Sequence, residues 1–192
     1  PVSPADHIAD PGPLGLAGFA TTTFVLSVFN AGIAPKTAEA VVLPLALFFG
    51  GTAQLLAGMW EFKKANTFGA VAFTSYGAFW LSFAAYVQFI VPGLSKTDAG
   101  LATGLYLLAW TIFTAYMTIA SLRTTGAVAA VFVVLLVTFV FLTIGDLGGS
   151  AGAGKIGGYL GIVTAVVAWY ASAAGVINAT WKRTVFPVMP LA

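Results

Sequence analysis

The sequence contains no cysteine, one histidine and few charged residues. Of its 192 residues, 7% are charged and 59% are hydrophobic, and the histidine is His7, close to the start of the chain. Without cysteine the chain forms no disulfide and has no thiolate metal site or thiol nucleophile. A single histidine in a polar tail cannot supply a buried haem ligand pair or a histidine-based metal or catalytic site. We therefore predict that the protein is not an enzyme and holds no metal or cofactor.

The scarcity of charge also determines the class of protein. An ordinary soluble domain carries about a quarter charged residues to cover its surface, and a disordered chain combines low hydrophobicity with high net charge. Neither description fits a hydrophobic chain with a net charge of +2. The basic residues are spread along the sequence and form no patch that could follow a phosphate backbone, so we expect no nucleic-acid partner. The composition predicts a polytopic membrane protein.

Six apolar stretches are long enough to cross about 30 Å of hydrocarbon as helices. Every lysine and arginine falls between or outside these stretches, which supports the number of spans independently. The predicted fold is all-α: a six-helix transmembrane domain over residues 14–181, with an N-terminal tail at 1–13 and a C-terminal tail at 182–192. The six predicted spans are residues 14–34, 41–60, 69–91, 101–122, 127–146 and 156–178.

An even number of spans places both termini on the same side of the membrane. Lysine and arginine concentrate in cytoplasmic connections, and the side of the termini carries five basic residues against three on the other. We therefore predict a multi-pass protein of the plasma or inner cell membrane with cytoplasmic termini. The five are Lys63, Lys64, Arg123, Lys182 and Arg183, and the three are Lys36, Lys96 and Lys155.

Polar side chains within the spans are the best candidates for functional residues. Each is costly in hydrocarbon and usually faces a bundle interior or a cavity. Gln54 and Glu61 lie two helical turns apart on a face of small residues, which is typical of a pore wall. Alternatively, Gln54 hydrogen-bonds a neighbouring helix and Glu61 pairs with Lys63 or Lys64. The tryptophans near span centres, such as Trp80, are better explained by packing between helices than by ligand contact.

Two further stripes mix polar and large apolar side chains at helical spacing. Such stripes suit a narrow passage for a small polar solute, and they match no catalytic triad or metal site. Asp146 and Glu61 are the titratable groups nearest this passage, so they are the candidates for proton or ion coupling. The first-span stripe is Phe19, Thr22, Thr23, Leu26 and Asn30, and the fifth-span stripe is Leu135, Thr138, Leu142 and Asp146.

Several motifs, in order along the chain, resemble those of the acetate uptake transporters. Residues 10–19, DPGPLGLAGF, are similar to the family signature N-P-A-P-L-G-L-x-G-F. Two positions depart from it, Asp10 for asparagine and Gly12 for alanine. Asp10 adds negative charge at a helix N-terminus that could otherwise attract an anion. The other matching segments are FGGTAQ at 49–54, EFKKANTFG at 61–69, FTSYGAFW at 73–80 and KRTVFP at 182–187.

The resemblance implies six transmembrane helices around a pore in each protomer, assembly into a homohexamer within membrane lipid, and passage of acetate and related small carboxylates such as succinate. It also implies a hydrophobic constriction formed by Phe19, Tyr76 and Leu135. At this ring we expect the solute to shed much of its water, and polar side chains nearby to replace part of that hydration. The polar residues expected to do so are Thr22, Gln54, Ser75, Tyr76 and Thr138, with Asn30 further along the passage.

No lysine or arginine lies within any predicted span, so we expect no fixed buried cation and therefore weak, rapidly reversible binding. Two alternatives remain open at this point. One is a channel for a small neutral solute or ammonium, which the scarcity of buried charge also allows. The other is a membrane subunit that transports nothing and stabilises a partner protein.

Overall fold

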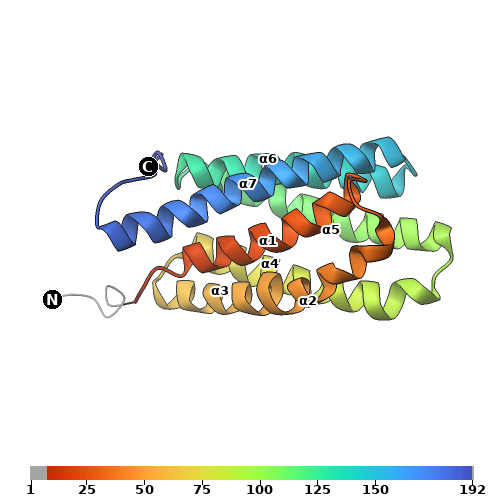
Figure 1. Ribbon diagram of the computed structural model, residues 1–192, viewed down its shortest axis with the longest axis horizontal. Coiled ribbons are helices and arrows are strands. Elements are labelled where there is room, and N and C mark those ends of the chain that lie inside the picture. Colours follow the sequence, from red (N-terminus) through yellow and green to blue (C-terminus); the bar gives the residue numbers. More distant parts are fainter. Residues whose placement is uncertain (1–7, 192) are drawn as a thin grey trace.

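The computed structural model describes residues 8–191, and its transmembrane part is an all-helical bundle (Figure 1). The predicted N-terminal tail, with His7, lies for the most part outside the described residues. Six helical segments are long and apolar enough to cross a membrane, which confirms the six predicted spans. They are Gly12–Asn30, Lys36–Lys63, Thr67–Gly93, Lys96–Ser121, Gly126–Leu147 and Ala151–Trp181.

Four of the six spans are continuous α-helices: α1 (Gly12–Asn30), α5 (Lys96–Ser121), α6 (Gly126–Leu147) and α7 (Ala151–Trp181). The second span is built from four pieces: the 3₁₀-helix η2 (Lys36–Val41), α2 (Val42–Leu47), the π-helix η3 (Phe48–Ala53) and α3 (Gln54–Lys63). The third span consists of α4 (Thr67–Ala85), the π-helix η4 (Tyr86–Ile90) and the 3₁₀-helix η5 (Val91–Gly93).

Side-chain caps explain why two spans begin earlier than hydropathy predicted. Ser95 accepts a hydrogen bond from the Asp98 backbone nitrogen at 3.1 Å, and Ser150 accepts one from Ala153 at 3.3 Å. Because an N-cap satisfies the free N–H groups of a first turn, that turn needs no apolar residues. Lys96 and Lys155 consequently lie inside α5 and α7, and their predicted placement in connections was wrong.

The first span is also shorter than predicted at its C-terminal end. α1 ends at Asn30, and Gly32 adopts a φ of +74°, which turns the chain out of the helix. At its other end, Asp10 accepts a hydrogen bond from Gly12 at 3.1 Å. The residue immediately before the helix is Pro11, so Asp10 acts one position outside it.

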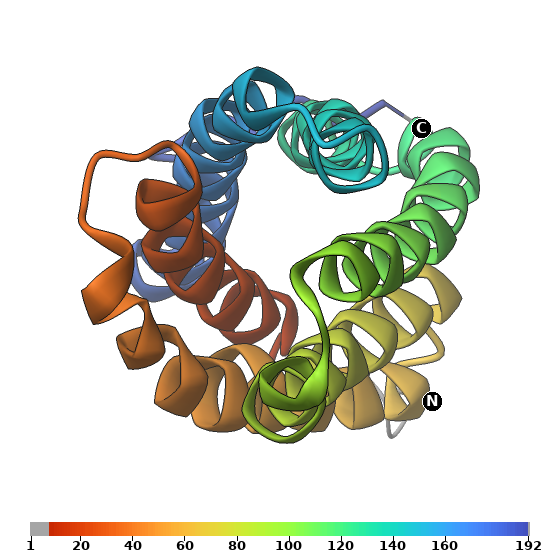
Figure 2. The same ribbon diagram turned by 90° about the vertical axis from the view of Figure 1, so that its right-hand side faces the viewer.

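The helices form a ring in the order α1, α7, α6, α5, α4 and the α2–α3 segment (Figure 2). α1 and α7 approach closely because glycines face backbone: a Cβ on Gly158 would overlap the Ala31 nitrogen. α4 and α5, in contrast, meet through aromatic rings, with 5.1 Å between the centroids of Phe79 and Trp110. The start of α1 and the end of α7 lie at the same end of the bundle (Figure 1).

The residues that follow α7 pack back onto the bundle. Lys182 turns the chain with a φ of 52°. The Gly126 nitrogen at the start of α6 donates to the Met189 carbonyl at 2.6 Å, and the Leu191 nitrogen donates to Thr124 at 3.0 Å. The predicted C-terminal tail is therefore a strap, defined here as residues 183–191, across the beginning of α6.

Candidate functional site

A large cavity lies inside the ring and is named here the vestibule. Its volume is about 870 Å³, and it extends from Phe19 and Leu135 in the middle of the bundle to the connections after α1 and before α7. Its deeper wall is mostly apolar. Its polar lining includes Thr23, Ser27, Asn30, Lys36, Glu39, Gln88, Thr138, Asp146 and Lys155.

A second, much smaller cavity lies on the other side of Phe19 and Leu135. This inner cavity has a volume of about 20 Å³, which is roughly the space of a single water molecule. Phe19 and Leu135 line both cavities, so their side chains stand between the two spaces. The complete lining of the inner cavity is Leu16, Phe19, Gln54, Ala72, Phe73, Tyr76, Val131, Phe132 and Leu135.

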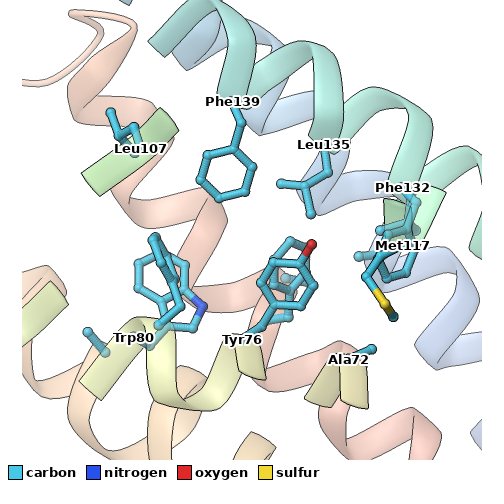
Figure 3. Close-up of a cluster of buried hydrophobic side chains, with 14 of the residues drawn as sticks. Ala72, Tyr76, Trp80, Leu107, Met117, Phe132, Leu135 and Phe139 are labelled. Atoms are coloured by element: carbon cyan, nitrogen blue, oxygen red, sulfur yellow. The ribbon is translucent and has the colours of Figure 1, made fainter. Parts of the chain in front are cut away.

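The three residues of the predicted constriction come together at this boundary. Phe19, Tyr76 and Leu135 come from α1, α4 and α6, and all three line the inner cavity. In Figure 3 the side chains of Tyr76 and Leu135 point toward each other from opposite helices. The rings of Phe19 and Tyr76 are 5.8 Å apart between centroids. Each of these residues is at most 5% exposed, so mostly apolar groups fill the space between the two cavities.

Besides Tyr76, three of the polar residues predicted to replace the lost water line a cavity. Thr138 and Asn30 belong to the vestibule wall and Gln54 to that of the inner cavity. The Thr138 hydroxyl donates to the Val134 carbonyl at 2.8 Å, as helical threonines commonly do. Gln54 is 1% exposed, and no donor among the described residues reaches its side-chain oxygen. An amide buried in this way remains able to accept a hydrogen bond.

Thr22 and Ser75, in contrast, line neither cavity. The Thr22 hydroxyl donates to the Gly18 carbonyl at 2.9 Å and packs against Gly50 of η3. Ser75 directly precedes Tyr76, and consecutive helical residues point about 100° apart. The inward direction of Tyr76 therefore does not by itself carry Ser75 into the cavity wall, and the packing of α4 leaves Ser75 outside it.

The two candidate coupling carboxylates occupy different places. Asp146 lines the vestibule. Glu61 is 2% exposed and accepts a hydrogen bond from the Asn66 side chain at 2.8 Å. The alternative pairing of Glu61 with a neighbouring lysine is not found among residues 8–191, where Lys64 instead approaches Asp10 at 4.0 Å.

Sequence reasoning did not identify three residues of the vestibule wall. Ser27 continues the polar stripe of the first span by one turn, and its spacing of four from Thr23 could have revealed it. Lys155 was assigned to a connection because hydropathy does not register a capped helix start, and Lys36 because it precedes the apolar stretch of the second span. Ser150, five residues before Lys155, is the signal that could have placed this lysine inside a helix.

The sequence matches known proteins over nearly its full length. It is 43% identical over 99% of its length to ammonia transport outward protein 2 of Saccharomyces cerevisiae, of which it covers 68%. It is 39% identical over 94% of its length to the succinate-acetate/proton symporter SatP of Escherichia coli, of which it covers 95%.

The fold also matches a solved structure over nearly its full length. The structure of the bacterial acetate channel SatP superposes with a TM-score of 0.87 at 38% identity, covering 94% of this chain and 99% of that one. The family model described as the GPR1/FUN34/yaaH family matches residues 2–192. A match over essentially the whole sequence, joined to this agreement in fold, shows that the chain belongs to the GPR1/FUN34/yaaH family.

Proposed function

We propose that this protein carries acetate and related small carboxylates across the membrane. One observation supports it above all: Phe19 and Leu135 separate two cavities inside a ring of membrane-spanning helices. A vestibule that narrows to an apolar closure is the arrangement expected of a selective passage. The solute class is taken from relatives whose names refer to acetate and succinate.

The closure selects small solutes through the cost of dehydration. A carboxylate passing Phe19, Tyr76 and Leu135 loses water, because their side chains offer apolar surface. In the inner cavity the Gln54 side-chain amide can donate its N–H to the carboxylate, whereas the Thr138 hydroxyl of the vestibule wall can donate only by leaving the Val134 carbonyl. Single dipoles hold an anion weakly, so the solute leaves as readily as it enters.

The two carboxylates differ in how they can serve proton coupling. Asp146 lines the vestibule, so its carboxylate can exchange a proton with the solution that the solute occupies. Glu61 lies outside both cavity walls and is held by Asn66. We assign coupling to Asp146 in preference to Glu61. Asp146→Asn is expected to retain downhill acetate flux and to lose accumulation driven by a pH gradient, whereas Glu61→Gln keeps both.

Labelled acetate uptake into proteoliposomes tests the proposed function directly. The purified protein is expected to carry acetate, and the double variant Phe19→Ala, Leu135→Ala is expected to change the rate severalfold. Ile112→Ala is the matched control, because this side chain of α5 is 62% exposed on the outside of the bundle. Unchanged flux in the double variant rules out the assigned closure. Flux of ammonium or a neutral solute without acetate supports the channel alternative, and no flux of any solute supports the scaffold alternative.

We further propose a homohexamer in the cell membrane with cytoplasmic termini. Large apolar side chains cover the outside of the helices, Ile112 and Ile119 of α5 among them, so these faces meet lipid or neighbouring protomers. Native mass spectrometry in detergent measures the number of protomers. Because the chain has no cysteine, single cysteines at Arg183 and Lys96 report the two sides to a membrane-impermeant thiol reagent, and Arg183→Cys is expected to react from the cytoplasm.

A further inference from the structure

Four charged residues line the vestibule: Lys36, Glu39, Asp146 and Lys155. The charges of Lys36 and Glu39 neutralise each other, because the Lys36 ammonium donates to the Glu39 carboxylate at 2.7 Å. The same ammonium donates to the Asn30 side chain at 3.2 Å. The ion pairs among residues 8–191 are Lys36–Glu39 and Lys64–Asp10, so Lys155 and Asp146 have no ion-pair partner there. These two side chains are the vestibule charges that form no ion pair among the described residues.

Lys155 has a defined position over the turn that ends α1. Its Cε and Nζ lie 3.4 and 3.9 Å from the place that a Cβ on Gly32 would occupy. A side chain at that position would meet the lysine stem. The carbonyl end of α1 is close by, and a cation is favoured at the C-terminal end of a helix. Lys155 is an exposed residue, and its stem lies over this turn at the mouth of the vestibule.

The same helix pair connects Lys155 with the deeper hydroxyls of the vestibule. A Cβ on Gly161 would overlap the Ser27 hydroxyl, so α7 faces Ser27 six residues beyond Lys155. Six helical residues span about 9 Å. Between mostly apolar walls, the field of a fixed charge reaches over such a distance with less screening than at an open surface.

We propose that Lys155 recruits anionic solutes, carboxylates in particular, into the vestibule, and that Asp146 opposes it. The identity of the solute as a carboxylate rests on the proposed function. The selection of anions over cations does not rest on the proposed function, because it can be measured without transport. Lys155 acts before the closure, so it governs capture of the solute and leaves the passage past Phe19 and Leu135 unchanged.

Modification of a single thiol tests this without any flux measurement. Ser27→Cys places the only cysteine of the chain in the vestibule wall. It is treated with methanethiosulfonate reagents carrying either a sulfonate or a quaternary ammonium group. At about 10 mM salt, where charges act over some 30 Å, adding Lys155→Gln is expected to slow the anionic reagent about two- to fivefold and speed the cationic one.

Three further variants make the test specific for charge. Asp146→Asn is expected to shift both rates in the opposite direction, and Lys155→Arg to leave them unchanged. Lys96→Gln is the matched control, because this lysine of α5 does not line the vestibule. All differences are expected to disappear in about 1 M salt, where the screening length is only some 3 Å. Thr138→Cys is a second reporter in the same wall.

One result would overturn the proposal: an unchanged ratio of the two reaction rates at low salt, whether both rates stay the same or both change by the same factor. Acetate uptake gives a separate measurement, in which Lys155→Gln raises the half-saturating concentration about two- to fivefold at low salt and leaves the maximal rate unchanged. If the protein carries no acetate but the reagent ratio still depends on Lys155, the proposed function fails and the inference about charge stands.

Discussion

The hydroxyl oxygens of Tyr76 on α4 and Thr114 on α5 share a buried hydrogen bond of 2.8 Å. It joins two helices that also meet through aromatic rings, such as Tyr76 and Phe113 with centroids 5.3 Å apart, and through the Tyr106 hydroxyl, which donates to the Phe79 carbonyl at 2.9 Å. The bond fixes one end of the Tyr76 ring, while Phe19 packs against the ring itself at 5.8 Å. In the closure that we propose, the Tyr76 ring is therefore held by the α4–α5 contact as well as by Phe19.

Tyr76→Phe removes this hydrogen bond and keeps the ring. We expect a loss of about 0.6 kcal/mol in the free energy of unfolding, the typical value for a hydrogen bond between membrane helices, with acetate flux changed less than twofold. Unfolding in mixed micelles and proteoliposome uptake measure the two quantities. Thr180→Val in α7 is the control, because among the described residues this hydroxyl bonds to the Val176 carbonyl of its own helix, at 2.8 Å. A large loss of flux in Tyr76→Phe would mean that the hydroxyl itself contacts the solute.

Gln54→Leu removes the amide of the inner cavity at nearly constant volume. If Gln54 replaces part of the lost hydration, the maximal rate of acetate uptake should fall about tenfold, since one lost hydrogen bond to a charged group costs about 1.5 kcal/mol or more. Gln88→Leu is the matched control, because Gln88 is an exposed residue of the vestibule wall. Equal effects of the two substitutions would contradict a specific role for Gln54.

Gly158→Ala tests the close contact between α1 and α7. The added Cβ overlaps the Ala31 backbone, and relieving such overpacking typically costs about 1–3 kcal/mol. Gly154→Ala, one turn earlier, meets nothing within 4 Å and should stabilise α7 by up to about 1 kcal/mol. Thermal unfolding in detergent should therefore shift in opposite directions for the two variants. Shifts of the same sign would show that α1 and α7 separate more easily than the structure indicates.

Asn178→Ala should loosen the strap. The Asn178 side chain accepts hydrogen bonds from Val185 at 2.7 Å and Phe186 at 3.0 Å, and donates to the Phe186 carbonyl at 2.8 Å. Their loss should speed amide hydrogen exchange at residues 185–191 and at Gly126 by about tenfold or more. Thr180→Ala is the control, because that hydroxyl bonds to Val176 within α7. Unchanged exchange in Asn178→Ala would mean that the strap is held by Tyr170, which donates to Pro187 at 2.7 Å, and by its backbone bonds at the start of α6.

Helical periodicity identified the faces of the spans but not their exact orientation. Thr22 and Thr23 are neighbours on the predicted stripe, yet Thr23 lines the vestibule and Thr22 packs against η3. The two side chains differ by 100° around the helix, and only the packing partners of α1 decide which of them turns inward. The same holds for Glu61, whose partner Asn66 is provided by the turn before α4.

The sequence by itself determined the class of protein, the number of spans and the family resemblance. These depend on composition and on local motifs, because the bilayer requires long apolar helices whatever their arrangement. The tertiary structure decided what the spans enclose. Phe19, Tyr76 and Leu135 lie far apart along the chain and meet only because α1, α4 and α6 face one another across the ring. Lys155 becomes a vestibule residue only because α7 packs against the end of α1, a contact between distant segments that no local pattern encodes.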